Sequence, residues 1–378
     1  MKRLAVFVPL VGVLSLAGAV TAVAQATAGD ALARGRMYVQ VAVRLSPRVH
    51  VLRQREPNFA GVVGNVTVIE QRDAVVLIDA GASHGSGERI VQQVRSITPK
   101  PVSAVVLTHW HGDHVMGLSA ILAAWPGAAV IAHSSAAADI EKRLSALFPL
   151  SPSSAYELEH IKSLRAAYAD IEKNQAAQAA TDAERKGWQT ALANLELRLA
   201  DVPGTHLVSA TRTLTDTLTL PDPVNPVVLQ FLGRANTDGD IVAWLPRDRI
   251  LVAGDVVVAP TPYMIQVFPR ELAATLASLR AMPFRVLVPG HGAPQRDRLY
   301  LDKLTALVAT VRDRVTPLAR AGVPLDSIPL RADFARERKT FAGSDAWLAY
   351  WFDLYGLSPL IESVFNEALG RPLGPTPR

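Results

Sequence analysis

A cluster of three histidines and one aspartate limits the folds open to this chain more than any other feature. His109, His111 and His114 are three of its nine histidines, and Asp113 lies among them. They follow an apolar, β-branched run at Val102–Leu107, which predicts a buried strand. Side chains two residues apart in an extended chain point the same way, so His109 and His111 can hold one metal ion. Asp113 and His114 then lie on the turn into a helix and can face a second ion.

The absence of cysteine narrows the chemistry of such a site. It excludes disulfide bonds and thiolate ligands, so a metal site must use His, Asp, Glu or Asn. Imidazole and carboxylate are the ligands that zinc takes when thiolate is absent. A surface cluster of histidines is the alternative, but it does not explain this spacing at the end of a strand.

The length and the charge of the chain limit how many domains it can form and which partners it can bind. The chain has 378 residues, 49% of them hydrophobic, which suffices for one large domain or two modest ones. The formal net charge is +5, but the basic residues are scattered among acidic ones instead of forming a stripe. We therefore expect a small-molecule substrate, and neither nucleic acid nor a membrane surface as a partner.

The N-terminus has the pattern of an export signal. Lys2 and Arg3 precede an apolar run over positions 4–20, and a small-x-small sequence at 22–24 offers a cleavage site. We predict a signal peptide at 1–24, a periplasmic or secreted mature protein, and no stable membrane span after cleavage. A permanent membrane anchor is the alternative, because the run approaches spanning length.

Strands alternate with helices through most of the chain, and each strand ends at a polar loop. This order predicts stacked sheets with helices outside. Strands are expected at 37–43, 49–52, 61–71, 74–81, 102–107, 129–133, 213–220, 226–232, 241–245, 250–253 and 285–288, and helices at 87–97, 114–124 and 270–282.

Two helical segments interrupt or follow this alternation. Residues 134–203 have apolar residues at helical spacing and predict a helical hairpin, which serves either as a lid or as a stabilising or dimerising insertion. Residues 297–378 predict a helical extension. Its aromatic residues favour burial in a core; they are Trp347, Tyr350, Trp351, Phe352 and Tyr355.

Two more candidate ligands stand at strand ends. Asp255 follows the predicted strand Ile250–Ala253, and His291 follows Arg285–Val288 within Pro-Gly-His-Gly. An α/β scaffold builds its site where several strands end. Each residue alone is weak evidence, but together with the histidine cluster they form a set.

In the order and spacing of these motifs the chain resembles the metallo-β-lactamase superfamily. The motifs are Asp79, the cluster at 109–114, the segment Gly233–Asp240, Gly254-Asp255 and His291. The resemblance implies an αβ/βα sandwich of two facing mixed sheets with external helices, over a catalytic domain at 30–296. It implies one metal on His109 and His111, a second on Asp113, His114 and His291, and Asp255 between them. It also implies that Asp79 fixes the loop of the cluster.

The third motif departs from the family. It normally carries a histidine ligand of the first metal, and Asn236 stands in that place. A neutral amide oxygen binds zinc more weakly than imidazole does. We therefore predict one or two zinc ions, with the Asn236 site looser, partly filled, or suited to a harder ion such as Mn²⁺ or Fe²⁺.

The remaining candidates are less specific. Tyr263 follows Asp255 by eight residues and is a candidate to polarise a substrate carbonyl, and His84 is a candidate to line the pocket. His206 could replace the missing ligand, although a loop or core position suits it better. The other histidines, His50, His133 and His160, are expected to be structural.

The resemblance implies hydrolysis by a metal-bound hydroxide, with Asp113 accepting the proton of the water. Glyoxalase-, lactonase- and esterase-like relatives keep an acid at the position of Asp255, whereas true β-lactamases usually have Cys or Ser there. We therefore expect an ester, thioester or lactone as substrate. Export favours the alternative, a metallo-β-lactamase, because β-lactams are met in the periplasm. Asn236 motivates a third possibility, a metal-binding domain without catalysis.

Overall fold

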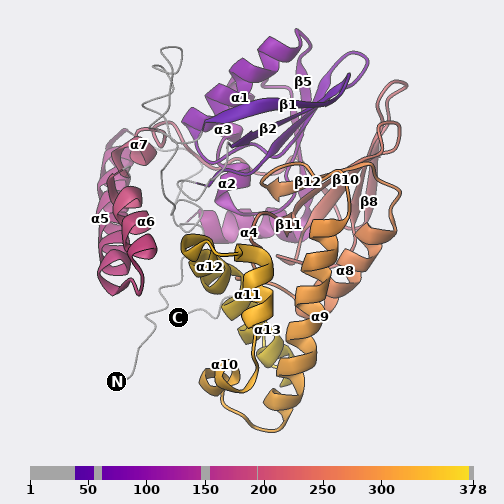
Figure 1. The fold of residues 1–378 in the computed structure, drawn as a ribbon. Helices are drawn as coiled ribbons and strands as arrows, with labels where there is room; N and C mark the ends of the chain where they lie inside the picture. Colours follow the sequence, from indigo (N-terminus) through magenta and orange to yellow (C-terminus); the bar gives the residue numbers. More distant parts are fainter. Residues whose placement is uncertain (1–38, 55–61, 146–153, 194, 374–378) are drawn as a thin grey trace.

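Two β-sheets face each other at the centre of the molecule, with helices against their outer sides (Figure 1). The computed structural model describes residues 39–54, 62–145, 154–193 and 195–373. The first sheet has seven strands in the order β1-β2-β3-β4-β5-β6-β7, and the second has five in the order β12-β11-β10-β9-β8. The predicted sandwich is therefore confirmed. The predicted signal peptide lies outside the described residues.

The first sheet begins antiparallel and continues parallel. Strands β1 (Gln40–Ser46), β2 (Val49–Gln54), β3 (Val66–Glu70) and β4 (Val75–Ile78) form a meander. Strands β5 (Val102–Val106), β6 (Ala129–His133) and β7 (Arg212–Leu214) then add in parallel. Parallel neighbours need crossovers, and these are α1 (His84–Ile97), the pair α2 (Gly112–Val115) and α3 (Leu118–Ala124), and the helical insertion.

The second sheet also has antiparallel strands followed by one parallel pair. Strands β8 (Thr217–Leu220), β9 (Val227–Phe231), β10 (Ile241–Leu245) and β11 (Ile250–Val258) are antiparallel. After α8 (Pro269–Ala281), β12 (Val286–His291) joins β11 in parallel. The candidate ligands lie after β5 in the first sheet and within the neighbouring parallel strands β11 and β12 of the second.

Three buried layers hold the sandwich together. Apolar side chains of both sheets, such as Val106 and Val252, meet between them. The outer face of the first sheet packs against α1 and α3, and that of the second packs against α8, α9 (Leu299–Arg320) and α13 (Ser358–Ala368). Burial of this apolar surface from water is the main favourable term in the folding of such a domain.

The predicted helical hairpin is present. After α4 (Ser134–Asp139) and a π-helical turn (Ile140–Leu144), helices α5 (Ser154–Gln178) and α6 (Asp182–Ala193) pack side by side, followed by α7 (Leu195–Leu199) (Figure 1). The extension continues from α9 through a 3₁₀ turn (Leu325–Ser327), α10 (Ile328–Arg331), α11 (Ala335–Ala342), α12 (Ala346–Trp351) and a π-helical turn (Phe352–Leu357) to α13. Trp188 of α6 packs with Trp351 and Tyr355 in a buried aromatic cluster, so the expected core role of these aromatic residues is confirmed.

The structure corrects three expected boundaries. The strand expected at 213–220 is two strands, β7 and β8, and they belong to different sheets, because the chain crosses between the sheets at Thr215-Asp216. The helix expected at 114–124 breaks into α2 and α3. Strand β11 does not end before Asp255 but runs on to Val258 through register shifts around Gly254.

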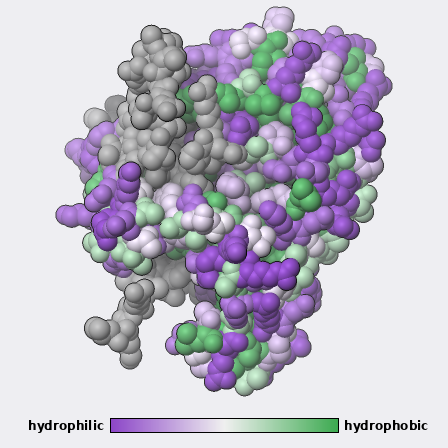
Figure 2. All heavy atoms as spheres, viewed as in Figure 1, coloured by the Kyte–Doolittle hydropathy of each residue, from purple (hydrophilic) through white to green (hydrophobic). Residues whose placement is uncertain are grey.

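Polar and apolar side chains both lie on the face of the molecule that Figure 2 shows. Polar side chains cover much of the described surface in Figure 2, and the large apolar side chains exposed among the described residues are Leu299, Leu330 and Leu369. None of the described helices is long and apolar enough to cross a bilayer.

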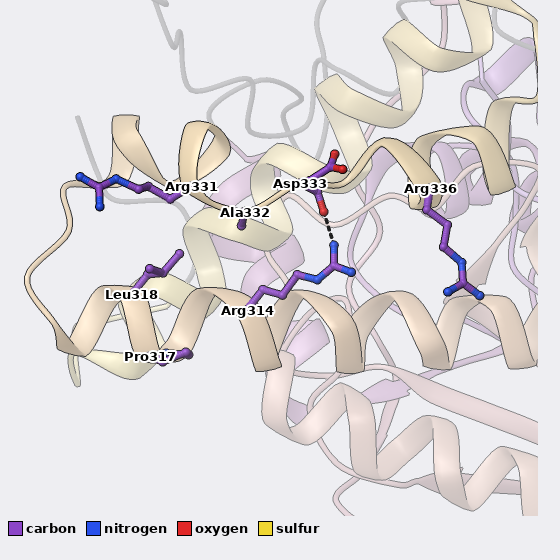
Figure 3. Close-up of a pocket in the computed structure, with 7 residues that line it drawn as sticks. All are labelled: Arg314, Pro317, Leu318, Arg331, Ala332, Asp333 and Arg336. Carbon is purple, nitrogen blue, oxygen red and sulfur yellow. Dashed lines mark hydrogen bonds between the residues drawn. The ribbon is translucent and has the colours of Figure 1, made fainter.

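A hollow of about 400 Å³ lies between α9 and the α10–α11 segment (Figure 3). Its charged side chains do not converge, because Arg331 and Arg336 point apart and Arg314 donates to the Asp333 carbonyl. No predicted site residue is among those that line it, which are Arg314, Pro317, Leu318, Arg331, Ala332, Asp333 and Arg336.

Candidate metal centre

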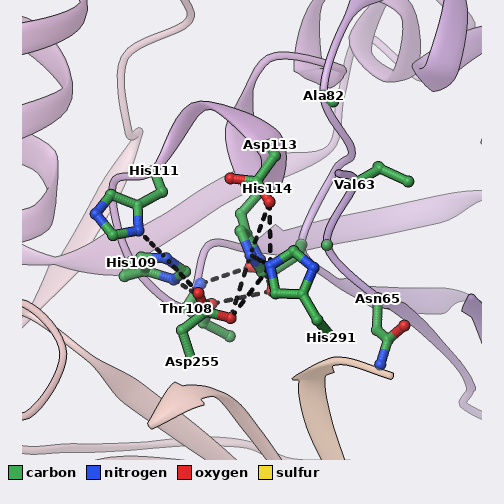
Figure 4. A network of polar contacts seen from close by, with 12 residues as sticks. Val63, Asn65, Ala82, Thr108, His109, His111, Asp113, His114, Asp255 and His291 are labelled. Atoms are coloured by element: carbon green, nitrogen blue, oxygen red, sulfur yellow. Dashed lines mark hydrogen bonds and ion pairs between the residues drawn. The ribbon is translucent and has the colours of Figure 1, made fainter. Parts of the chain in front are cut away.

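The predicted ligands converge from four segments of the two sheets. His109 and His111 lie on the loop after β5, and Asp113 and His114 lie in the α2 turn that follows. Asp255 lies within β11, and His291 is the last residue of β12. Figure 4 shows these six side chains pointing toward one another. All six are buried, with at most 8% of any residue exposed.

The first group of donors consists of two imidazoles and one carboxylate. His109 Nε2 lies 2.9 Å from His111 Nδ1 and 3.5 Å from Asp255 Oδ2. The opposite ring nitrogens contact other residues: His109 Nδ1 lies 3.0 Å from Thr108 Oγ1, and His111 Nε2 lies 3.3 Å from Gln266 Oε1. The nitrogens that face Asp255 and each other are therefore those available to a metal ion.

The second group lies beside the first. His291 Nε2 lies 3.1 Å from both His114 Nε2 and Asp113 Oδ2, and the latter two atoms are 3.5 Å apart. Asp255 turns its other oxygen to this group, with Oδ1 3.4 Å from His114 Nε2 and 3.6 Å from His291 Nε2. One carboxylate therefore faces both groups, each with a different oxygen, which is the geometry expected of a bridging ligand.

Asp79 supports the second group from behind. Its Oδ1 accepts from the Thr108 N–H at 2.8 Å, and its Oδ2 accepts from Thr108 Oγ1 at 3.0 Å. Oδ2 also lies 2.8 Å from His114 Nδ1, which leaves Nε2 of that ring to the donor group. Asp79 has φ +67°, an uncommon conformation that the surrounding contacts must maintain.

The pKa of His109 in the first group is lowered, whereas the pKa of His114 in the second group is raised. Burial lowers the pKa of His109 well below its usual range, and the adjacent His114 lowers it further, which favours the neutral imidazole. Burial also lowers the pKa of His114, but three carboxylates outweigh this effect and raise it, namely those of Asp113, Asp255 and Asp79. This concentration of negative charge around a buried imidazole is a setting that a cation would stabilise.

The donor set fits divalent metal ions. Within each group the donor atoms lie within 4.8 Å of one another, and they are imidazole nitrogens and carboxylate oxygens, as zinc prefers in the absence of thiolate. Asp255 Oδ1 and His291 Nδ1 are buried and have no hydrogen-bonding partner among the residues that the structure describes. Leaving a buried polar group unsatisfied costs about 1–3 kcal/mol of folding free energy. A metal ion between the groups would offset this cost at the Asp255 carboxylate.

Asn236 lies on the loop between β9 and β10. It is 1% exposed, and within the described part of the chain neither its Oδ1 nor its Nδ2 has a hydrogen-bonding partner. The loop adjoins the centre, because Ile241 N–H donates to the Thr108 carbonyl at 2.9 Å and Phe268 N–H donates to the Ala235 carbonyl at 2.9 Å. An unsatisfied buried amide is unusual and suits a side chain that binds a further group. Its role as a metal ligand stays a prediction.

Tyr263 lies beside the first group. Its ring centroid is 5.6 Å from that of His111 and 5.8 Å from that of Tyr355, and no hydrogen bond of its hydroxyl is found among the described residues. Burial raises the pKa of Tyr263, and the charges of Asp113 and Asp255 raise it further, which places the phenol within their electrostatic reach. The position suits the predicted contact with substrate.

Three of the other histidines have contacts outside the two groups. His84, in α1, has its Nδ1 2.9 Å from Ser119 Oγ of α3, and its role in lining the pocket stays a prediction. His206 Nδ1 donates to the nearby Gly204 carbonyl at 3.0 Å. His133 accepts from Ser135 N–H and stacks on Phe231.

The sequence prediction missed three uncharged contacts. Thr108 bonds Asp79 and contacts His109, Gln266 contacts His111, and Asn65 contacts the backbone around His291. Thr108 could have been noticed as the residue that precedes the histidine cluster. Gln266 and Asn65 carry no local signal, because their partners are distant in sequence.

Comparison with known proteins places this geometry in a family. The model of the metallo-beta-lactamase superfamily matches residues 60–291. The linear primary-alkylsulfatase of Pseudomonas sp. (strain ATCC 19151) is 24% identical over 260 residues, which are 66% of this chain and 44% of that protein. The chain thus spans less than half the length of that relative.

A solved alkylsulfatase structure shares the fold. The stereoselective inverting sec-alkylsulfatase Pisa1 from Pseudomonas sp. aligns with a TM-score of 0.59 and 18% identity, over 88% of this chain and 50% of that chain. A metallo-beta-lactamase from Pontibacter korlensis aligns with a TM-score of 0.49 and 18% identity, over 71% of this chain and 99% of that chain.

Proposed function

The chain belongs to the metallo-beta-lactamase superfamily, and from this premise we propose that it is a metal-dependent hydrolase of carboxylic esters, thioesters or lactones. The observation that carries the proposal is the pair of adjacent donor groups that face the two oxygens of Asp255. We propose zinc as the metal, because the donors are imidazole and carboxylate. Mn²⁺ or Fe²⁺ is a candidate at the first group, to which the family resemblance assigns Asn236.

Metal ions held by these residues would supply a Lewis acid and lower the pKa of water. The chain's own residues hold the ligands in place: Asp79 orients His114, and Thr108 contacts both Asp79 and His109. Fixed ligand orientation avoids reorganisation during the reaction.

Two residues have proposed roles toward the substrate. Asp113, whose Oδ2 lies in the second group, accepts a proton from the attacking water. The Tyr263 hydroxyl, free of partners among the described residues and beside His111, donates a hydrogen bond to the substrate carbonyl oxygen. Its raised pKa keeps the phenol protonated at neutral pH.

A sulfate ester is the second candidate substrate. The linear primary-alkylsulfatase relative matches 66% of the chain, and the alignment with Pisa1 covers 88% of it. Both relatives are named for alkyl sulfate hydrolysis, which is also cleavage of an ester. The N-terminal pattern supports export, so substrates met outside the cytoplasm belong in the test.

The test is a substrate panel with the zinc-loaded protein: p-nitrophenyl esters and thioesters, lactones, a primary alkyl sulfate, and nitrocefin for the β-lactam alternative. We expect ester or lactone hydrolysis that a chelator abolishes and zinc restores. His291→Ala should abolish it, and His50→Ala, which removes a histidine from β2 outside both donor groups, should not.

The panel also separates the alternatives. Turnover of the alkyl sulfate alone would select the second candidate, and turnover of nitrocefin alone would select a β-lactamase. A zinc-loaded protein that hydrolyses nothing in the panel would contradict the proposal and favour a metal-binding domain without catalysis.

A further inference from the structure

The segment just before β3, which carries Val63 and Asn65, passes beside His291 at the edge of the metal centre (Figure 4). Asn65 is 4% exposed and makes three hydrogen bonds to the turn that carries His291. Its backbone N–H donates to the Gly290 carbonyl at 2.7 Å, and its Nδ2 donates to the carbonyls of Pro289 at 2.8 Å and Gly292 at 2.9 Å. One side chain therefore holds the backbone on both sides of this candidate ligand.

The preceding residue, Gly64, contacts the other two members of the second group. Its N–H donates to the Asp113 carbonyl at 3.1 Å. A Cβ on Gly64 would lie 2.4 Å from Cε1 of His114, so the backbone passes directly over this imidazole and leaves no room for a side chain. Gln40 Nε2 donates to the Gly64 carbonyl at 2.8 Å and secures the segment from its other side.

These contacts join the two halves of the sandwich at the second donor group. Asp113 and His114 belong to α2, beside the first sheet, whereas His291 ends β12 of the second sheet. A metal site loses affinity when its ligands depart from their geometry by about 0.5 Å. A small relative shift of the two sheets would separate His291 from the other two.

We propose that Gly64 and Asn65 form a brace that positions the second metal group and thereby sets its affinity for a divalent cation. Neither residue binds the ion. Gly64 fixes the distance between the segment and His114, and Asn65 fixes the His291 turn to the same segment. The proposal rests on the proposed metal centre and adds to it a residue pair that positions three ligands.

Asn65→Ala removes both side-chain hydrogen bonds to the turn and keeps the backbone bond to Gly290. Loss of residues that support metal ligands costs about 10–100-fold in metal affinity. Asn225→Ala is the matched control, because Asn225 is also buried, at 1% exposed, but bonds the Glu70 carbonyl away from the centre. Asn65→Ser, a smaller disturbance, serves if Asn65→Ala does not fold.

The experiment is a Zn²⁺ titration of the full-length, metal-free protein by calorimetry, in two backgrounds that isolate the groups. In the His111→Ala background, where the second group is the intact one, Asn65→Ala should weaken binding 10–100-fold. In the Asp113→Ala background, where the first group is the intact one, it should change binding less than threefold. Asn225→Ala should change neither.

Equal weakening in both backgrounds, or the same affinity for Asn65→Ala and Asn225→Ala, would overturn the brace and leave the proposed function standing. Failure of the unmutated protein to bind any Zn²⁺ would instead overturn the proposed metal centre, and the brace with it.

Discussion

The two donor groups are neighbours, yet they are supported very differently. The second group, Asp113, His114 and His291, has Asp79 behind one imidazole and hydrogen bonds from Asn65 around another. The first group has only uncharged side chains behind its imidazoles among the described contacts, Thr108 Oγ1 at 3.0 Å from His109 and Gln266 Oε1 at 3.3 Å from His111. Asn236 stands where the family implies a third imidazole.

This difference teaches that a shared carboxylate does not make two metal sites equal. Asp255 contributes one carboxylate oxygen to each group, so this ligand is the same for both and does not make their metal affinities differ. The inequality comes from the other ligands and from the residues that hold them. We therefore expect the second group to bind zinc tightly and the first to bind it more weakly.

The largest effect is expected from Asp255→Ala, which removes the residue common to both groups. Both groups should lose zinc affinity, and hydrolysis should fall on the order of 10²–10³-fold or more. Metal content per chain after dialysis, measured beside the initial rate, checks this. Retention of one full equivalent of zinc would show that Asp255 serves a single group.

A smaller and one-sided effect is expected from Asp79→Ala. The mutation removes the partner of His114 Nδ1, so zinc affinity of the second group should fall about 10–100-fold. Calorimetric titration in the His111→Ala background measures that group by itself. A fall of the same size in the Asp113→Ala background would mean that Asp79 supports both groups through Thr108, which would weaken the contrast between them.

The smallest effect is expected from Tyr263→Phe, which keeps the ring beside His111 and removes the hydroxyl. Loss of one hydrogen bond worth about 1.4 kcal/mol should lower kcat about tenfold and leave both zinc affinities unchanged. Steady-state kinetics and zinc titration on the same preparation test this. An altered zinc affinity would assign Tyr263 to the support of the first group instead of to substrate.

Much of the centre could be predicted because it is local in sequence. The cluster from His109 to His114 carries its own spacing and follows a recognisable strand, and the structure brings its members together. Strands β6 and β10 begin and end where apolar periodicity placed them. The convergence of Asp255 and His291 depended on a family pattern, because no local rule brings distant strands together.

The rest could not be predicted for a physical reason. Strands β7 and β8 share one alternating Thr and Leu pattern, and the point where the chain leaves one sheet for the other depends on tertiary packing. Asn65 and Gln266 act through backbone carbonyls and a ring nitrogen that are more than 150 residues away. An uncharged side chain in a strand or loop has no spacing that indicates such a partner.

The most direct test of unequal metal groups is a stepwise Zn²⁺ titration of the metal-free protein, with Asn236→His beside the unmutated chain. We predict two binding events of different affinity, and in Asn236→His we predict that the weaker event strengthens by about tenfold or more while the tighter one is unchanged. Two events of equal affinity in the unmutated protein, with no response to Asn236→His, would contradict the account.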